Sequence, residues 1–270
     1  MLNNSFSAGN PTTKITQINT QTKFNQINGI NEITQVNQIS PFTSPIDHRS
    51  WVLWPVGLSP LHLQVFGAAA FLVSVPVFVQ APLVRSLPWV SLFLTIGWLI
   101  TSLQLLKNPH RAIWGDLLLG FTLTWFTGGL FWGWLRWEPF LHLPVESLAM
   151  PLAIWCLQRG KGLIGNWFYL GSLLGTAITD GYFYIMGLIP YWRTLMLVEE
   201  ESLARSVLQN ALTIVKTNTG ITWIIILTTL LVVIGLVPLS SSKLHWWAFA
   251  GAVLSTILVD GLFFLVASFA

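Results

Sequence analysis

Five ionisable side chains lie inside stretches of sequence that are otherwise apolar. Four are acids and the fifth is a histidine: Asp116, Glu146, Asp180, Asp260 and His142. In hydrocarbon such a group costs roughly 2.5 to 3.5 kcal/mol, so it usually faces the interior of a helical bundle. Intramembrane ionisable groups mark ion pathways, proton relays or interhelical hydrogen bonds. These five residues are therefore the candidates for any chemistry.

His142 and Glu146 are four positions apart, which places them on one face of a helix. The pair could form a proton site, or His142 could bind the metal of a tetrapyrrole as an axial ligand. The simpler alternative is a hydrogen-bonded histidine. Asp116 stands near the start of its stretch, where an interfacial position would explain it. A single cysteine, Cys156, allows neither a disulfide within the chain nor a cysteine-based metal site.

Two polar stripes have the same composition. Thr176 and Asp180 share a helical face, as do Thr256 and Asp260. The stripes could line a pathway or bind a cation. Alternatively, each aspartic acid, protonated if buried, could bond to a neighbouring helix and stabilise the packing. Both interpretations remain open at this point.

The composition identifies the medium in which these residues lie. Of the 270 residues, 53% are apolar and 9% are charged, whereas a soluble domain carries roughly 25% charge. The protein also has 15 tryptophans, which collect at membrane interfaces. The basic residues that give a net charge of +3 are scattered, so we expect a lipid bilayer and no nucleic acid as partner.

Seven stretches have about the length and apolarity of a membrane-spanning helix. The sequence therefore predicts an all-α, polytopic transmembrane helix bundle of about seven spans, the first kinked at Pro76. The fourth stretch is the weakest, because it is short and contains His142, Pro144 and Glu146. The seven are Leu61–Val84, Pro88–Leu106, Ile113–Leu135, Phe140–Leu157, Leu163–Ile189, Ile221–Pro238 and Leu244–Ala270.

Two segments lie outside these spans. Residues 1–50 are rich in Asn, Gln and Thr and predict a disordered tail, which leaves 51–270 as the transmembrane helical domain. Residues 191–220 form the one long connection, an extramembrane loop. Within it, Leu208, Leu212 and Val215 fall on one stripe, which predicts a short amphipathic helix on the membrane surface.

An internal repeat connects three of the stretches. Residues 124–132, 176–184 and 256–264 each have Thr, then Gly five positions on, Phe seven on and an aromatic residue eight on. All three fall on odd-numbered spans, so they predict three parallel helical hairpins. The alternative is a recurrent glycine and aromatic packing motif. In the first copy Gly128 replaces the acid, so we expect close helix contact there and no polar site.

Three segments, Phe71–Arg85, His110–Asp116 and Thr179–Tyr184, resemble a family of uncharacterised multi-pass membrane proteins of cyanobacteria. The likeness extends from about Trp51 onward. It implies a photosynthetic bacterium and a thylakoid or plasma membrane, but it supplies no reaction, cofactor or site residue.

No motif of hydrolases, kinases, P-loop proteins or zinc enzymes is present, so we expect no enzyme, no catalytic residue and no metal site. The favoured function is a non-enzymatic scaffold or assembly factor for photosynthetic complexes, with other membrane proteins as partners. The alternative is a transporter or channel for a small solute or ion that uses Asp180 and Asp260. A water-accessible cavity at both acids would favour transport, and acids bonded to neighbouring helices would favour the scaffold. The charges of the short loops predict a cytoplasmic N-terminus.

Overall fold

The computed structural model describes residues 59–269, and within that range every regular element is a helix. The predicted tail at 1–50 lies outside the described residues. The helices follow the predicted apolar stretches. They are α2 Pro60–Val75, η1 Pro76–Gln80, α3 Ala81–Ser86, α4 Pro88–Leu106, α5 Ala112–Trp134, η2 Pro139–Leu141, α6 His142–Glu146, η3 Ser147–Ala149, α7 Met150–Gln158, α8 Leu163–Ile185, α9 Ile189–Leu197, α10 Glu201–Val215, α11 Asn218–Leu236, η4 Val237–Ser240 and α12 Leu244–Phe269.

Pro76 changes the winding of the first apolar stretch without ending it. Proline lacks an N–H group and clashes with the carbonyl one turn earlier, so an ordinary α-helical turn cannot form at that point. The chain instead forms the π-helical turn η1 and then continues as α3. This wider turn ends at Gln80, which is fully buried. Turns of this kind are frequent at functional sites.

Helices α8 and α12 run parallel to each other in close contact. Gly171 lies against Phe249 and Ala252, and Gly175 lies against Thr256. Residue numbers therefore increase in the same direction along both helices. Glycines spaced four apart remove side-chain bulk from one face of α8, and this allows the approach.

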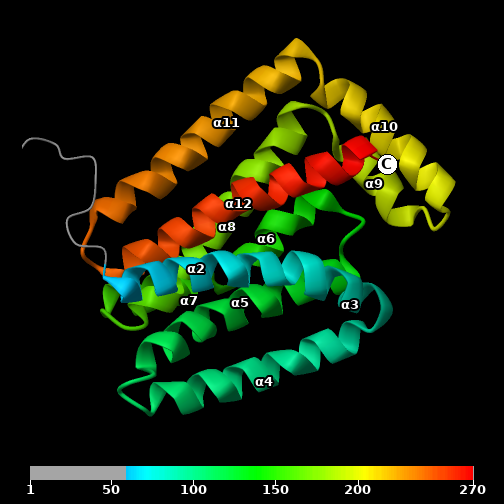
Figure 1. Cartoon of the computed structure of the whole chain (residues 1–270). Coiled ribbons are helices and arrows are strands. Elements are labelled where there is room, and N and C mark those ends of the chain that lie inside the picture. Colours follow the sequence, from blue (N-terminus) through cyan, green and yellow to red (C-terminus); the bar gives the residue numbers. More distant parts are fainter. Residues whose placement is uncertain (1–58, 270) are drawn as a thin grey trace, which may run out of the picture. The chain divides into compact units, whose positions relative to one another are not determined.

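Two further helices share this direction. Helix α2 packs on α12, where His62 meets Trp247 with ring centroids 5.2 Å apart. The contact continues along η1, where Phe78 meets Phe263 with ring centroids 6.5 Å apart. The first half of α5 lies beside the start of α8, where Gly120 touches the backbone of Gly165. Figure 1 shows α2, α5 and α12 running side by side.

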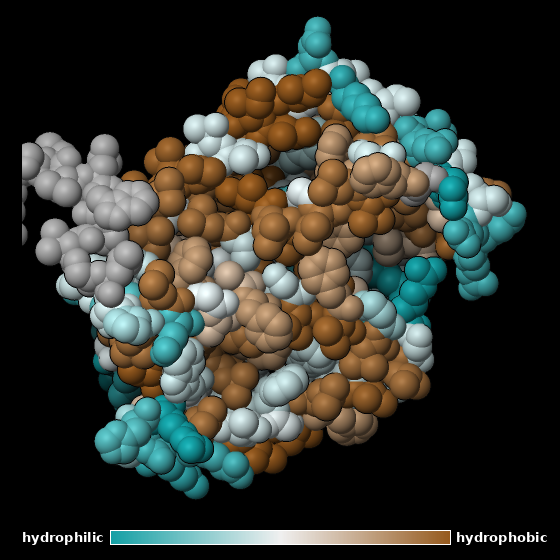
Figure 2. All heavy atoms as spheres, viewed as in Figure 1, coloured by the Kyte–Doolittle hydropathy of each residue, from teal (hydrophilic) through white to brown (hydrophobic). Residues whose placement is uncertain are grey.

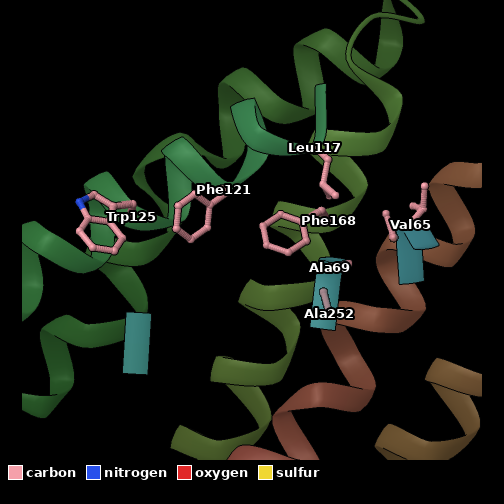
Figure 3. Close-up of a cluster of buried hydrophobic side chains, with 8 residues drawn as sticks. Val65, Ala69, Leu117, Phe121, Trp125, Phe168 and Ala252 are labelled. Carbon is pink, nitrogen blue, oxygen red and sulfur yellow. The ribbon is translucent and has the colours of Figure 1, made fainter. Parts of the chain in front are cut away.

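The buried apolar core lies among these four parallel helices. One cluster draws residues from all of them, as Figure 3 shows. Helix α5 contributes the largest side chains, including Trp125, which is 1% exposed. The cluster consists of Val65, Ala69, Leu117, Phe121, Trp125, Phe168, Ala248 and Ala252.

The return helices pack outside this core and present apolar side chains outward. Helix α4 lies antiparallel on α5, and Trp89 and Trp98 contact its two halves. Trp89 on α4 is 61% exposed and Ile225 on α11 is 60% exposed. Brown, hydrophobic atoms cover most of the face seen in Figure 2, and hydrophilic atoms gather toward its margins. Such a surface indicates an integral membrane protein.

Among the described residues, five helices are long and apolar enough to cross a membrane, or six if the bent pair α8 and α9 is one span. Helix α5 is not among them, because glycine, threonine and tryptophan lower its hydropathy. The count of seven spans stays a prediction.

The fifth predicted stretch was too long. Helix α8 ends at Ile185, and α9 leaves it at an angle of 104° after Gly187, whose φ of +66° favours glycine. Helix α9 therefore occupies part of the segment that we expected to be a loop. Helix α10 lies where the amphipathic helix was predicted, with Leu212 buried.

Candidate functional site

His142 lies between two carboxylates from different elements. Its Nδ1 is 3.0 Å from both carboxylate oxygens of Asp180 on α8. Its Nε2 is 3.2 Å from Glu146 Oε1, one turn along α6. Asp180 is 2% exposed and His142 is 7% exposed. Spacing alone predicted the pair of His142 and Glu146, whereas Asp180 joins it only through the packing of α6 on α8.

The two contacts of the ring set the smallest number of protons that this cluster of His142, Glu146 and Asp180 can hold. Each contact needs one hydrogen, carried either by the ring nitrogen or by the carboxyl group. If both are on the ring, an imidazolium stands between two carboxylates. If one is on a carboxyl group, a neutral ring stands between an acid and a carboxylate. Both arrangements leave a net charge of −1, and a further proton on a carboxyl oxygen outside these two contacts would make the cluster neutral.

Aromatic rings enclose the histidine on its other sides. Ring centroids of Phe131, Trp132 and Trp192 lie 4.3, 5.6 and 5.4 Å from that of His142. Such rings exclude water, and their faces attract a cation. Axial ligation of a tetrapyrrole metal, one of the alternatives for His142, does not fit this geometry, because both ring nitrogens already face carboxylates.

Helix α9 covers the cluster from the end of the bundle. Trp192 donates from its indole nitrogen to the Arg136 carbonyl at 3.0 Å, and Arg193 pairs with Glu138 at 2.7 Å. The bond from Arg193 holds the pKa of the Glu138 carboxyl below its usual value. Since this ion pair is about 40% exposed (42% and 36%), solvent screens it and it contributes little to stability.

Gln80 on η1 is a further polar residue near the cluster, and it lies against Gly128 on α5. Gln80 reaches across to Gly128, and Glu146 approaches the same glycine from the other side. The expectation of no polar site at Gly128 was wrong, because this glycine leaves room for two polar side chains from elsewhere. Gln80 was missed because a single neutral amide in an apolar run gives no pattern.

Asp260 lies at the level of Asp180 but has a different partner. Its carboxylate accepts a hydrogen bond of 2.8 Å from Thr179, the residue before Asp180. Thr256 is buried against Gly175 on the same helix pair. Thr176 lies half-buried on α8 and contacts the Glu146 carboxylate. The two predicted stripes therefore face different neighbours.

Asp116 is separate from these residues. Its Oδ2 accepts a hydrogen bond of 2.9 Å from the backbone nitrogen of Ile164, in the first turn of α8. Gly162 stands at the N-cap of α8 and has no side chain to cap it. A carboxylate satisfies free N–H groups at a helix N-terminus and interacts favourably with the helix dipole. Asp116 thus caps a neighbouring helix.

Among residues 59–269 no group of three or more His, Cys, Asp or Glu side chains is arranged to hold a metal ion. Residues 69–268 match the family described as "Protein of unknown function (DUF3120)". No curated protein and no solved structure matches the chain.

Proposed function

Because the chain belongs to the family of unknown function DUF3120, which assigns no activity, we propose its function from the site: a membrane transporter or channel for a small ion, without covalent catalysis. The observation that carries the proposal is the buried ring of His142 between Glu146 and Asp180. Intramembrane ionisable groups are expensive, and they are the usual sites of ion binding and proton transfer.

The charge of the cluster supports ion binding over packing. A cluster with a net charge of −1 is costly away from water unless a cation or a further proton neutralises it. Among the described residues, no Lys or Arg is paired with Glu146 or Asp180. Helix packing needs only neutral hydrogen bonds, such as those of serine and threonine, and does not account for three ionisable groups in contact.

Asp260 has the contacts expected of a packing residue. Its partner is the Thr179 hydroxyl on a neighbouring helix. Asp180 is likewise bonded to a neighbouring helix, through His142 on α6, so by the criterion set above the contacts of both acids favour a scaffold. The proposal departs from that criterion for Asp180 because its partner is itself ionisable. The proposal therefore assigns ion binding to Asp180, together with His142 and Glu146, and packing to Asp260. The rival function is a scaffold in which both acids serve packing alone.

The finer parts of the proposal rest on the sequence. They are seven spans formed by one helix and three parallel hairpins, a thylakoid or plasma membrane of a cyanobacterium, and a cytoplasmic N-terminus. The parallel contacts of α5, α8 and α12 support the hairpins, since the repeat falls on these three helices.

Ion-driven currents of the full-length protein would test the proposal. Purified protein in liposomes on a solid-supported membrane would receive jumps of Na⁺, K⁺, ammonium or pH. We expect a transient current with at least one of these ions. Asp180→Asn keeps the shape and hydrogen bonding of the residue but removes its charge, so it should accumulate normally and lose the current.

Glu201→Gln is the matched control, because Glu201 is 89% exposed and lies on α10 outside the cluster. It should retain the current. Wild-type protein that gives no current with any of the four jumps would contradict the proposal, as would an unchanged current in Asp180→Asn. Either result would favour the scaffold.

A further inference from the structure

Gly128 on α5 carries no side chain, and oxygen atoms from two other elements face the position that a Cβ atom would occupy, here called the space beside Gly128. A Cβ atom placed on Gly128 would lie 3.3 Å from Gln80 Oε1 and 3.9 Å from Glu146 Oε1. Within the described part of the chain, no other atom beyond the local backbone of α5 lies within 4 Å of this position. The atoms from other elements nearest to this position are therefore both oxygens.

The orientation of the Gln80 amide is fixed by its other contacts. Its Nε2 donates to the Trp125 carbonyl at 2.6 Å, and a carbonyl can only accept. Oε1 must therefore face the space beside Gly128. Gln80 is 0% exposed, and its Oε1 has no hydrogen-bond partner among the described residues. Buried polar atoms without a partner are costly, so this oxygen indicates a ligand.

The ligand must be positively charged or donate hydrogen bonds. Glu146 Oε1 faces the same space and belongs to the cluster whose net charge is −1. Two acceptor oxygens repel an anion. Glu146 Oε1 already faces His142 Nε2, whereas Gln80 Oε1 has no donor among the described residues. One positive charge would neutralise a cluster of charge −1 and give Gln80 Oε1 a partner, whereas a divalent ion would leave an excess of charge.

We infer that the space beside Gly128 binds one small monovalent cation, either an alkali ion or ammonium, through Gln80 Oε1 and the Glu146 carboxylate. Hard cations prefer oxygen ligands of this kind. The inference rests on the proposed function, because it names the ligand class of the same site. Through Glu146, the cation would be coupled to His142 and Asp180.

Thermal unfolding of the full-length protein in nanodiscs tests this inference. The salts are NaCl, KCl, NH₄Cl and N-methyl-D-glucamine chloride at equal ionic strength, the last being too bulky to enter. A ligand that binds the folded state raises the unfolding temperature in a saturable way. We expect this rise with at least one small cation and none with N-methyl-D-glucamine.

Gly128→Ala places a methyl group in the space while leaving both oxygens present. The Gln80 side chain must give way by a few tenths of an ångström, and the variant should need roughly tenfold or more of the cation for half of the effect. Gly67→Ala is the control, since nothing lies within 4 Å of its new Cβ. It should respond as the wild type does. Gln80→Leu, which removes the oxygen, should behave like Gly128→Ala.

Equal unfolding temperatures of the wild type in all four salts would overturn the inference, and this comparison needs no variant. An unchanged cation dependence in Gly128→Ala or Gln80→Leu would also overturn it. This experiment and the transport experiment can fail independently. Cation binding without current would contradict the proposed function alone, and current without cation-specific stabilisation would contradict the site alone.

Discussion

The four intramembrane acids differ in role because they differ in partner. Asp180 and Glu146 share one histidine, whereas Asp260 accepts from a threonine and Asp116 accepts from a backbone N–H group. Only the first two form a cluster with an unbalanced charge. The residue type and its position within an apolar stretch are therefore insufficient to assign a role to an acid. The group that its carboxylate contacts determines the role.

The capping role of Asp116 gives the first prediction at this scale. Asp116→Ala removes the acceptor for the first turn of α8 and should lower stability by about 0.5 to 2 kcal/mol, the usual cost of a lost cap. Asp116→Asn keeps an acceptor oxygen, so its loss of stability should be much smaller. Unfolding of both variants in the same nanodiscs measures the difference. Equal losses would show that the charge, and not the cap, stabilises α8.

Sequence patterns identified part of the candidate site. Helical spacing joined His142 to Glu146, and apolar surroundings marked all four acids as candidates. The contact between His142 and Asp180 spans 38 positions, and no local pattern predicts it. Gln80 was missed because its position depends on the π-helical turn at Pro76, a detail of winding that composition and periodicity do not determine.

At the scale of elements, α8 and α12 are the helix pair in most extensive contact. Gly171 and Gly175 provide a face without side chains on α8, and Ala252 and Thr256 fill it from α12. In lipid there is no hydrophobic driving force between helices, so close packing of this kind contributes much of the association. The pair also holds Thr179 against Asp260.

Gly175→Ala tests this packing. The new Cβ would overlap Thr256, which lies closer than any ordinary contact, so the helices must separate at a cost of about 1 to 3 kcal/mol. Gly181→Ala on the same helix is the control, because its Cβ meets no atom within 4 Å. That variant should be neutral or slightly stabilised. A comparable fall in unfolding temperature for both variants would contradict the expected contact.

The sequence predicted these elements better than their ends. Apolar length and flanking charges located the long helices, and the stripe of leucines located α10. The sharp turn after α8 was missed, because Gly187 is followed by the apolar residues Leu188 and Ile189, which continue the pattern of a span. Helix α9 consequently appeared as the end of a span and the start of a loop, although it covers the candidate site.

For the whole molecule, the shared direction of α2, α5, α8 and α12 constrains the topology. Helices that run in the same direction through a membrane begin at the same face. The turns that precede α5, α8 and α12 must then lie together, and the connection before α11 must lie opposite. Five or six helices qualify as spans by length and composition. If all four of these parallel helices cross, a return crossing between each consecutive pair is expected, which would give the seven spans predicted from the sequence.

Labelling of single cysteines tests the seven-span topology. Single cysteines would replace Asn108, Lys161, Ser242 and Lys216 in a Cys156→Ser background, and a membrane-impermeant maleimide would label them in sealed vesicles. The first three should react from one face, and Lys216→Cys should react from the other. The basic residues of the short loops predict that the first face is cytoplasmic, so those three should be protected in right-side-out vesicles. If Lys161→Cys reacted from the same face as Lys216→Cys, the fourth stretch would not cross, and the parallel arrangement of α5 and α8 across the bilayer would be wrong.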